Sequence, residues 1–549
     1  MTASTPPDVS FWLGFLLWFV IGYAEIHFRI PGLPSRLFKK EPEIVFDLPH
    51  RATVGNAVPL FLFVKDADRF PVKLGDISVT IYRFGDAIAI ANHTFRVNAA
   101  IDTYFASNTF WLPETAFPEP GKYLILSNLA YIVNGRQQQL VQDNYRGLKT
   151  APFQITIGES GLPTLPGMHW GDIHIHSNFT DDAVEFGAPI AETAVCAQSL
   201  GLSFFAITDH SFDLDEPSVD DWHVSQPNPR WDQFLQHIYA AQTAHPEICI
   251  IPGEEVSVGN SRNENVHCLL LGNRRFYPGT GDSGDRLLHN RPTLTLPELI
   301  SLVNANDPDA LIIAAHPFDV PPVSQKAVLN RGFWRRDDRH LPALCGWQLL
   351  NGRKDVFYDY GFEKWREALL SGKQIGIFAG TDAHGNFNNF RQVKIPLLQM
   401  IFHRQQLLGQ TRTGIFLEEK PDETAVLAQL SRKRAVISNG PAAWLGIDQN
   451  GQRHFPGETI AAETPFTAQI SAKSTAEFGK ISEIRLITGN VPTRKESIQL
   501  IQPVLAAGSI EKTIDFPHGL PTGYLRLSVF SDHPDGEPCF CHTNPIWIG

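Results

Sequence analysis

The middle of the chain alternates between short apolar runs and longer stretches with helical periodicity. Capping residues support one more helix, which is predicted to begin at the capping box Thr295-Leu-Pro-Glu298. Serial strand and helix units give parallel strands, and a closed barrel is the usual way to cover them. The pattern therefore predicts an α/β barrel. Its strands are expected at 172–176, 203–207, 248–252, 265–271, 310–315, 345–350 and 375–379, with other helices at 188–200, 231–244 and 361–371.

The flanking regions have a different pattern. From about 42 to 157, short alternating runs separated by turn-rich pieces are typical of a β-sandwich, and after 440 runs such as FTAQISA and GYLRLSVF predict a second one. The stretch GESGLPTLPGM, rich in Gly and Pro, marks a boundary before the barrel. The predicted organisation is an apolar N-terminal segment at 1–40, an Ig-like β-sandwich at 41–157, a barrel at 165–440 and a C-terminal β-sandwich at 441–549.

An uncharged apolar run occupies residues 11–24, with the sequence FWLGFLLWFVIGYA. It is shorter than the ~20 residues that a spanning helix needs. A secretory signal would have Lys or Arg before the apolar run, and none precedes this one. Basic residues follow it instead: Arg29, Arg36, Lys39 and Lys40. Two interpretations stay open: a membrane association that leaves the rest of the protein in the cytoplasm, or an apolar helix packed on a protein surface.

Charge and cysteine content exclude some classes. The net charge of -12 argues against general nucleic-acid binding, which depends on clustered Lys and Arg. The six cysteines lack the paired spacings of a disulfide framework, so a reducing compartment fits better. The CFCH sequence at 539–542 could begin a metal site, but no second cluster would complete it, and ordinary strand residues are the favoured interpretation.

The candidate chemistry begins with Asp172-Ile-His174-Ile-His176 on the first predicted strand. Because side chains alternate along a strand, Asp172, His174 and His176 face one side, so two imidazoles converge. Further polar residues recur near the ends of later apolar runs. In a barrel, the C-terminal ends of the strands surround one opening, where catalytic residues collect. The recurring polar residues are Asp181, Asp209 and His210, Glu255, His267, His316, and Asp382 with His384.

The order HxH, TDH, GxE, AHP and TDAH resembles the PHP family, named for polymerase and histidinol phosphatase domains. The resemblance covers roughly residues 168–400 and implies a distorted (β/α)7 barrel with a trinuclear metal site. It implies three ligand groups: His174, His176, Glu255 and Asp382; Glu255, His267 and His316; and Asp181, His210 and His384. Of these residues, His174, His176, Asp382 and His384 are expected to be catalytic.

Some assignments have alternatives. Asp182 adjoins Asp181 and Glu254 adjoins Glu255, and the spacing favours Asp181 and Glu255. Asp172 and Asp209 are interpreted as carboxylates that orient neighbouring imidazoles, or as solvated strand-end residues. The ligand types suit zinc, manganese or iron, up to three ions. Three basic residues near the predicted mouth could orient a phosphate or be ordinary surface residues: Arg262, Arg353 and Arg391.

These features predict a metal-dependent hydrolase, since adjacent divalent cations activate water and clamp phosphoryl oxygens. The favoured substrates are small phosphomonoesters or phosphodiesters. The flanking sandwiches resemble the long branch of the family that includes carbaryl hydrolase, so carboxylate or carbamate ester hydrolysis is the enzymatic alternative. The alternative from another class is a non-catalytic, metal-containing binding scaffold.

Overall fold

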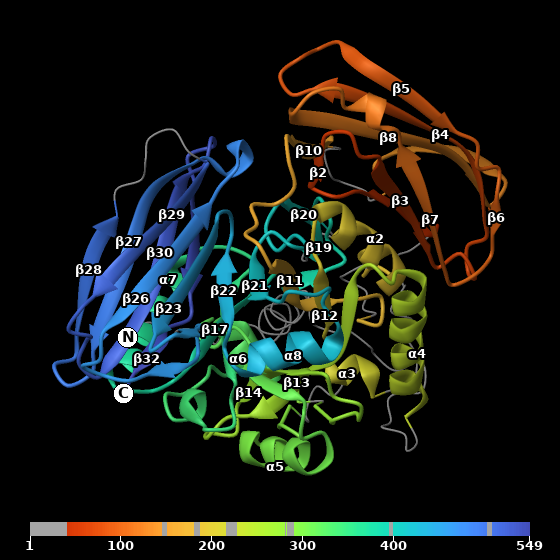
Figure 1. Ribbon diagram of the computed structural model, residues 1–549. Helices are drawn as coiled ribbons and strands as arrows, with labels where there is room; N and C mark the ends of the chain where they lie inside the picture. The colour runs from red at the N-terminus through yellow and green to blue at the C-terminus, as the bar shows by residue number, and fades with distance from the viewer. Residues whose placement is uncertain are drawn as a thin grey trace, which may run out of the picture.

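The protein is mixed α/β and rich in strands, with several β-sheets arranged around a central part (Figure 1). The computed structural model describes residues 41–144, 151–180, 187–215, 228–279, 281–282, 290–394, 399–501 and 508–549. Among these residues, no helix combines the length and the apolar character needed to cross a membrane. The apolar run 11–24 lies outside the described residues.

The N-terminal part contains two sheets around one apolar core. All of β3 (Val58–Lys65) is buried, because both of its faces are covered. Leu60 and Leu62 belong to the core of this part, whereas Phe61 and Phe63 belong to a core shared with the central part. One sheet is formed by β1 (Glu43–Asp47), β3 and β7 (Phe105–Leu112), and the other by β2 (Arg51–Thr53), β10 (Phe153–Gly158), β8 (Gly121–Val133), β4 (Val72–Arg83) and β5 (Ala89–Phe95), with the short β6 (Ala100–Ile101) and β9 (Arg136–Val141) at its side.

The central sheet follows chain order, and it curls back on its first strand. After the last strand, β18 (Ala383–His384) pairs in parallel with the first, and the Asp382 N–H donates to the His174 carbonyl at 2.8 Å. The strands, in spatial order, are β17 (Gly376–Gly380), β16 (Gly346–Asn351), β15 (Leu311–Ala314), β14 (Asn265–Leu271), β13 (Cys249–Gly259), β12 (Phe204–Ile207) and β11 (Met168–His176).

Helices connect and cover these strands (Figure 1). The predicted capping box is confirmed, because Thr295 and Glu298 exchange both hydrogen bonds at the start of α5. The helices are α2 (Ile190–Leu200), α3 (Ser211–Leu214), α4 (Pro229–Ala244), α5 (Leu296–Asn306), α6 (Val323–Leu329), α7 (Val356–Leu370) and α8 (Glu423–Ser431).

Two features of the central sheet differ from the sequence prediction. First, the strands are not all parallel: β14 runs antiparallel to both β13 and β15, because a short turn at 260–264 joins β13 directly to β14 without a helix. Second, β13 extends to Gly259, well past the predicted end at 252. Glu255 therefore lies inside a strand and not just after one.

The C-terminal part is joined to the central part through a continuous sheet. Next to β11 lie β21 (Arg412–Phe416) and β22 (Ala435–Ser438), and β22 pairs with β31 (Pro538–Thr543). The sheet then continues through β30 (Gly523–Asp532), β27 (Lys480–Asn490) and β28 (Lys495–Ile501). A second sheet contains β24 (Gln452–His454), β23 (Ala442–Gln449), β26 (Phe466–Lys473) and β29 (Ser509–Phe516), and the remaining short strands are β25 (Thr459–Ile460), β32 (Ile546–Ile548), β19 (Phe390–Lys394) and β20 (Gln399–His403).

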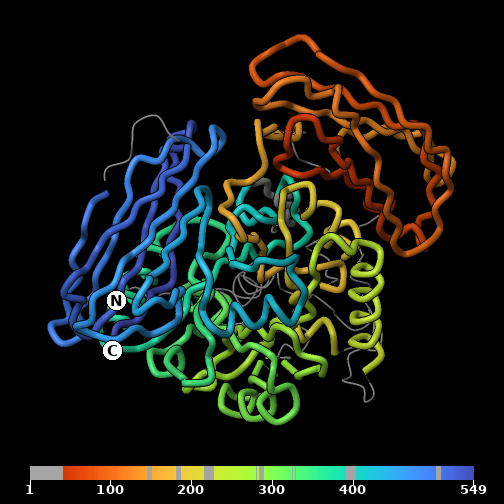
Figure 2. Tube along the Cα trace, in the orientation of Figure 1, coloured from red at the N-terminus to blue at the C-terminus, as the bar shows by residue number. Residues whose placement is uncertain are grey.

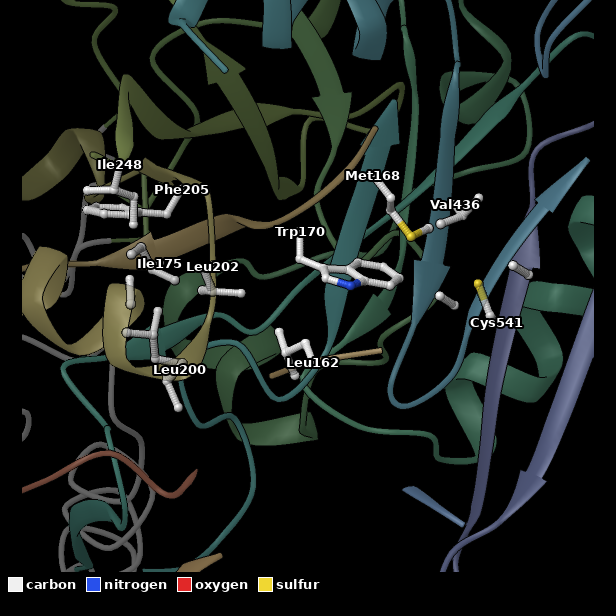
Figure 3. Packing of buried hydrophobic residues seen from close by; sticks show 14 of the residues in the cluster. Leu162, Met168, Trp170, Ile175, Leu200, Leu202, Phe205, Ile248, Val436 and Cys541 are labelled. Carbon is white, nitrogen blue, oxygen red and sulfur yellow. The ribbon is translucent and has the colours of Figure 1, made fainter. Parts of the chain in front are cut away.

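One buried apolar cluster crosses from the central part to the C-terminal part. Trp170 of β11 lies in this cluster together with Val436 of β22 and Cys541 of β31, and on its other side the cluster reaches Leu200 of α2 (Figure 3). The Cα trace shows the N-terminal sheets at the upper right of the central part and the C-terminal sheets at its left (Figure 2).

Candidate metal centre

A buried group of imidazoles and carboxylates lies where β11, β13, β14 and the segment after β17 meet. Their possible ligand atoms lie within 4.8 Å of one another in three groups. This buried His, Glu and Asp cluster could hold metal ions. The groups are His174, His176, Glu255 and Asp382; His210, Glu255 and His267; and His176, His210 and His384.

Glu255 is the centre of this arrangement. Its Oε2 atom lies 3.0 Å from His210 Nδ1, 3.4 Å from His174 Nε2 and 3.5 Å from His176 Nε2. Its Oε1 atom lies 2.7 Å from His267 Nδ1 and 3.1 Å from His316 Nε2. One carboxylate therefore separates five imidazoles into two sets, with one oxygen facing each set.

The distances among His174, His176, Asp382 and Glu255 match those of ligands around one ion. His174 Nε2 and His176 Nε2 are 3.1 Å apart, and Asp382 Oδ1 lies 3.3 Å and 3.1 Å from them. Ligand atoms bound at about 2.0–2.1 Å in a tetrahedral arrangement stand about 3.3–3.4 Å apart. These four side chains could therefore hold one metal ion.

Gln348 on β16 fixes which nitrogen of His174 faces the cluster. The Gln348 amide donates to Asn351 Oδ1 at 2.9 Å, which leaves its Oε1 to accept from His174 Nδ1 at 2.8 Å. The proton of a neutral His174 is then on Nδ1, so Nε2 presents a lone pair toward His176 and Glu255. Such hydrogen bonds set ring orientation and basicity in metal sites.

His176 is oriented in the same way through Thr180 and Asp209. The Thr180 hydroxyl donates to Asp209 Oδ1 at 2.8 Å and lies 3.3 Å from His176 Nδ1. Asp209 also accepts from the Ser177 backbone and hydroxyl, each at 2.8 Å. The interpretation of Asp209 as an orienting carboxylate is therefore supported, and it acts through the loop after β11.

His267 has a more complex environment. Its Nε2 lies 3.0 Å from Asp282 Oδ2, and its Nδ1 faces both Glu255 and, at 3.3 Å, the Nη2 atom of Arg331. Arg331 also donates to Asp282 at 2.7 Å. A buried guanidinium therefore stands beside the nitrogen of His267 that a second ion would use.

The charges of the cluster suit metal binding. Burial opposes ionisation of Glu255, but the His267 and His174 imidazoles hold its pKa well below its usual range. Burial, with His384 and His210 nearby, lowers the pKa of His176 far below its usual value. Burial also lowers the pKa of His174, but the Glu255 and Asp382 carboxylates outweigh it and raise that pKa to about 9. A bound cation would replace the proton on His174.

Two residues of the centre have unusual backbone conformations. His316 has φ of 26° and Asp382 has φ of 55°, in the region that residues other than glycine rarely adopt. Asp382 lies between β17 and β18, where the chain turns toward β11. Strained conformations cluster at functional sites, because the surrounding structure must hold them.

The sequence-predicted residues have different outcomes. His174, His176, His210, Glu255, His267, Asp382 and His384 are brought together, and His316 joins them through Glu255. Asp181 and its neighbour Asp182 lie outside the described residues. Glu254 points away, toward Ser211, Asn273 and Tyr277.

Within the described part of the chain, no hydrogen bond joins the Asp172 carboxylate to an imidazole ring. Its carboxylate accepts from the Thr381 hydroxyl at 2.5 Å and from Gly409 N at 3.1 Å, so it fixes the segment before Asp382. Arg262 is exposed, Arg353 is paired with Asp355, and the side chain of Arg391 is outside the described part of the chain. The CFCH residues are buried strand residues of β31, and all six cysteines are free thiols.

Sequence reasoning missed Gln348, Asp282 and Arg331. For Gln348 a signal existed, because a polar side chain inside the apolar run GWQLLN needs a buried partner. Asp282 and Arg331 lie in irregular segments on either side of α5, and no local pattern indicates their contact with His267.

Comparison with known proteins does not identify a family. No protein-family model and no curated protein sequence matches the chain. Similar solved structures include a cycloisomaltooligosaccharide glucanotransferase from Paenibacillus sp., at 10% identity over 92% of this chain and 71% of that one, with a TM-score of 0.18. A β-glucuronidase from Parabacteroides merdae and a β-D-mannosidase from Dictyoglomus thermophilum are 8% and 9% identical over 92% of this chain and 64% and 66% of theirs, with TM-scores of 0.16 and 0.21. Such low scores carry no argument about fold or function.

Proposed function

We propose that this protein is a metal-dependent hydrolase of the PHP type that cleaves small phosphomonoesters or phosphodiesters. The observation that carries the proposal is the position of Glu255, whose two oxygens face two sets of imidazoles. A carboxylate placed in this way can bridge two cations. The return of β18 to β11 supports the distorted seven-stranded barrel that the PHP resemblance implies.

In this proposal His174, His176, Glu255 and Asp382 would hold one ion. Glu255, His267 and His316 would hold a second, and His210 and His384, with Asp181 as the family resemblance implies, would hold a third. Divalent ions of zinc, manganese or iron would lower the pKa of a coordinated water toward ~7 and polarise the ester.

The protein's own groups define the approach of a substrate. His316 and Asp382 are the least enclosed of the cluster, with side chains 13% and 9% exposed, whereas His174 and Glu255 are fully buried. Asn351 donates to Asp382 Oδ2 at 3.4 Å and turns Oδ1 toward the imidazoles. A substrate would therefore enter between the segments that follow β15 and β17.

Two guanidinium groups near the cluster would orient an anionic substrate, and each also pairs with a carboxylate. Arg331 lies beside His267 and donates to Asp282, and Arg353, two residues beyond Asn351, is paired with Asp355. Exposed apolar residues near this entry support the carbamate or carboxylate ester alternative, since Val320, in the segment after His316, is 56% exposed, and Val356, at the start of α7, is 73% exposed. Substrate assays separate the two.

The test is hydrolysis by metal-reconstituted protein of a phosphomonoester, a phosphodiester and a carbamate ester. His174→Ala should lower phosphate-ester turnover at least about a hundredfold. The matched control is His169→Ala, on the same strand but bonded to Ser203 outside the cluster. Turnover of the carbamate ester alone would move the protein to the alternative. Absence of turnover with metals bound would overturn the hydrolase proposal in favour of a binding scaffold.

A further inference from the structure

The N-terminal sheets provide a buried carboxylate to the segment that follows His384. Asp47, the last residue of β1, is fully buried. Its Oδ2 accepts from Phe387 N at 3.3 Å, and its Oδ1 accepts from Asn388 N at 3.1 Å. Two consecutive backbone amides, three and four residues after His384, are thus held by a residue more than 300 positions earlier in the chain.

Aromatic packing supports the same contact. Phe387 lies with its ring 5.1 Å from that of Phe61 and 6.3 Å from that of Phe63. Phe61 is the strand partner of Asp47 across β1 and β3. The carboxylate and the aromatic pair therefore form one surface of the N-terminal sheets, and Phe387 is inserted against it.

Side-chain hydrogen bonds extend this contact on both sides. Asn388 donates to the Gln154 carbonyl at 2.9 Å, and Arg404 donates to the same carbonyl at 2.9 Å and to Asn388 Oδ1 at 3.2 Å. His50, three residues after Asp47, contacts the Leu408 carbonyl at 3.1 Å. The N-terminal part therefore contacts the chain at 387–388 and again at Arg404 and Leu408.

These two segments lead directly to the metal centre. Leu408 N donates to the Asn386 carbonyl at 3.0 Å, and Gly409 N donates to Asp172 at 3.1 Å. Only Gly385, with φ of 68°, and Asn386 separate His384 from Phe387. A Cβ at position 385 would stand 2.4 Å from Ala188 N, so the backbone is closely packed there and has little freedom to compensate.

We propose that Asp47 is a positioning residue for His384, so that the N-terminal sheets are a structural part of the metal centre and not a separable binding module. The inference rests on the proposed function for its link to catalysis, but not for its link to metal binding. Loss of the carboxylate would release the Phe387 and Asn388 amides, and His384 would lose its fixed distance from His176 and His210.

The test compares Asp47→Ala, Asp47→Asn and Leu62→Val in the full chain loaded with Co²⁺. Leu62 lies on β3 and faces the core of the N-terminal part, so Leu62→Val controls for a loss of stability alone. The readouts are the number of ions bound, the visible absorption of Co²⁺, the melting temperature, and kcat and KM for the best substrate.

We expect Asp47→Ala to weaken the affinity for one ion by about tenfold to a hundredfold and to change the Co²⁺ spectrum. Asp47→Asn should restore part of the loss, because one oxygen still accepts an amide hydrogen bond. Leu62→Val should lower the melting temperature while the ion count stays unchanged.

Folded Asp47→Ala with the wild-type ion count and spectrum would overturn the inference, even if the wild type hydrolyses esters. Conversely, a wild-type protein that binds ions but does not hydrolyse esters would contradict the proposed function. In that case, loss of an ion in Asp47→Ala would still support the inference. A wild type that binds no ion would overturn both.

Discussion

At the scale of single residues, the neighbours Glu254 and Glu255 show how a strand separates identical side chains. Both are buried, but on opposite faces of β13. Glu255 lies among imidazoles that keep it ionised, whereas burial raises the pKa of Glu254 well above its usual range. Only one of the two is suited to bind a cation.

The pair therefore offers a matched prediction. Glu255→Gln should abolish binding of at least one ion, because the variant removes the charge between the two sets of imidazoles. Glu254→Gln should leave ion binding within about threefold of wild type, since this side chain points away from the imidazoles, toward Ser211, Asn273 and Tyr277. Elemental analysis of purified, reconstituted proteins measures both, and equal losses in the two variants would contradict the prediction.

The residue scale is also where sequence reasoning is most successful. The two-residue period places His174 and His176 on one face of β11, and the structure confirms that their Nε2 atoms converge at 3.1 Å. The contact between the Arg331 guanidinium and His267 could not be predicted in this way. Arg331 lies in an irregular segment, which has no periodicity to interpret.

At the scale of elements, the close approach of β17 to β11 depends on Gly380. A Cβ at this position would stand 2.7 Å from His174 Cβ and 3.0 Å from His174 N. Backbone and ligand side chain lie in direct contact there, so no flexible group can move aside. The glycine is required by space and not by its φ angle.

We therefore predict that Gly380→Ala displaces β17 from His174 and weakens ion binding about tenfold or more, since ligand spacing must hold within a few tenths of an ångström. A titration with Zn²⁺ against a competing chelator measures the affinity. Gly372→Ala tests the specificity of the effect, because Gly372 lies in an exposed turn after α7, although its positive φ will cost some stability. Unchanged zinc affinity in Gly380→Ala would contradict the prediction.

Most elements of the central part could be predicted from periodicity, whereas the direction of β14 could not. The apolar run at 265–271 has the same pattern in either direction, since alternation does not encode strand polarity. The extension of β13 past 252 was also not predicted, because Pro252 and Gly253 interrupt the apolar run. Pairing with β14 holds this segment in the sheet.

At the scale of the whole molecule, Arg51 joins three parts of the chain. It donates to Glu477 Oε1 and Oε2 at 2.9 and 2.8 Å and to the Leu200 carbonyl at 2.8 Å. Its side chain is only 3% exposed. Sequence reasoning gives no indication of this contact, because its partners are hundreds of residues apart.

Removal of one partner of this ion pair should be costly. Arg51→Met leaves the Glu477 carboxylate without its bidentate partner, and we expect a loss of about 3–5 kcal/mol in the free energy of unfolding. Urea denaturation measures this loss. The double variant Arg51→Met, Glu477→Leu should recover much of it, and a single-variant cost under about 1 kcal/mol would contradict the prediction.

The buried imidazole of His50 should make the protein less stable in acid, at the junction of the N-terminal part with the 404–408 segment. Burial, with Arg404, Arg51 and Arg412 nearby, lowers its pKa from 6.5 to about 3. Above pH ~6.5 the imidazole is neutral in both states and has no effect. Between pH ~6.5 and ~3 the unfolded chain binds a proton that the folded chain does not. The free energy of unfolding therefore falls by up to about 1.4 kcal/mol for each unit by which the pH is lowered.

His50→Gln should reduce this dependence, because its amide can donate to the Leu408 carbonyl without binding a proton. Unfolding free energies measured between pH 7 and pH 5 in both proteins give the slopes. Identical slopes would show that other groups determine the acid sensitivity.

The pairing of β22 with β31 has a consequence for biogenesis. Ser438 is bonded to a residue 102 positions later, and β22, which is fully buried in the folded protein, has β31 along one edge. During synthesis the apolar edge AVIS is complete long before β31 leaves the ribosome. Such an unpaired edge is a template for aggregation. The nascent chain should therefore depend on a chaperone that shields this edge, and its yield should fall when translation outpaces that protection.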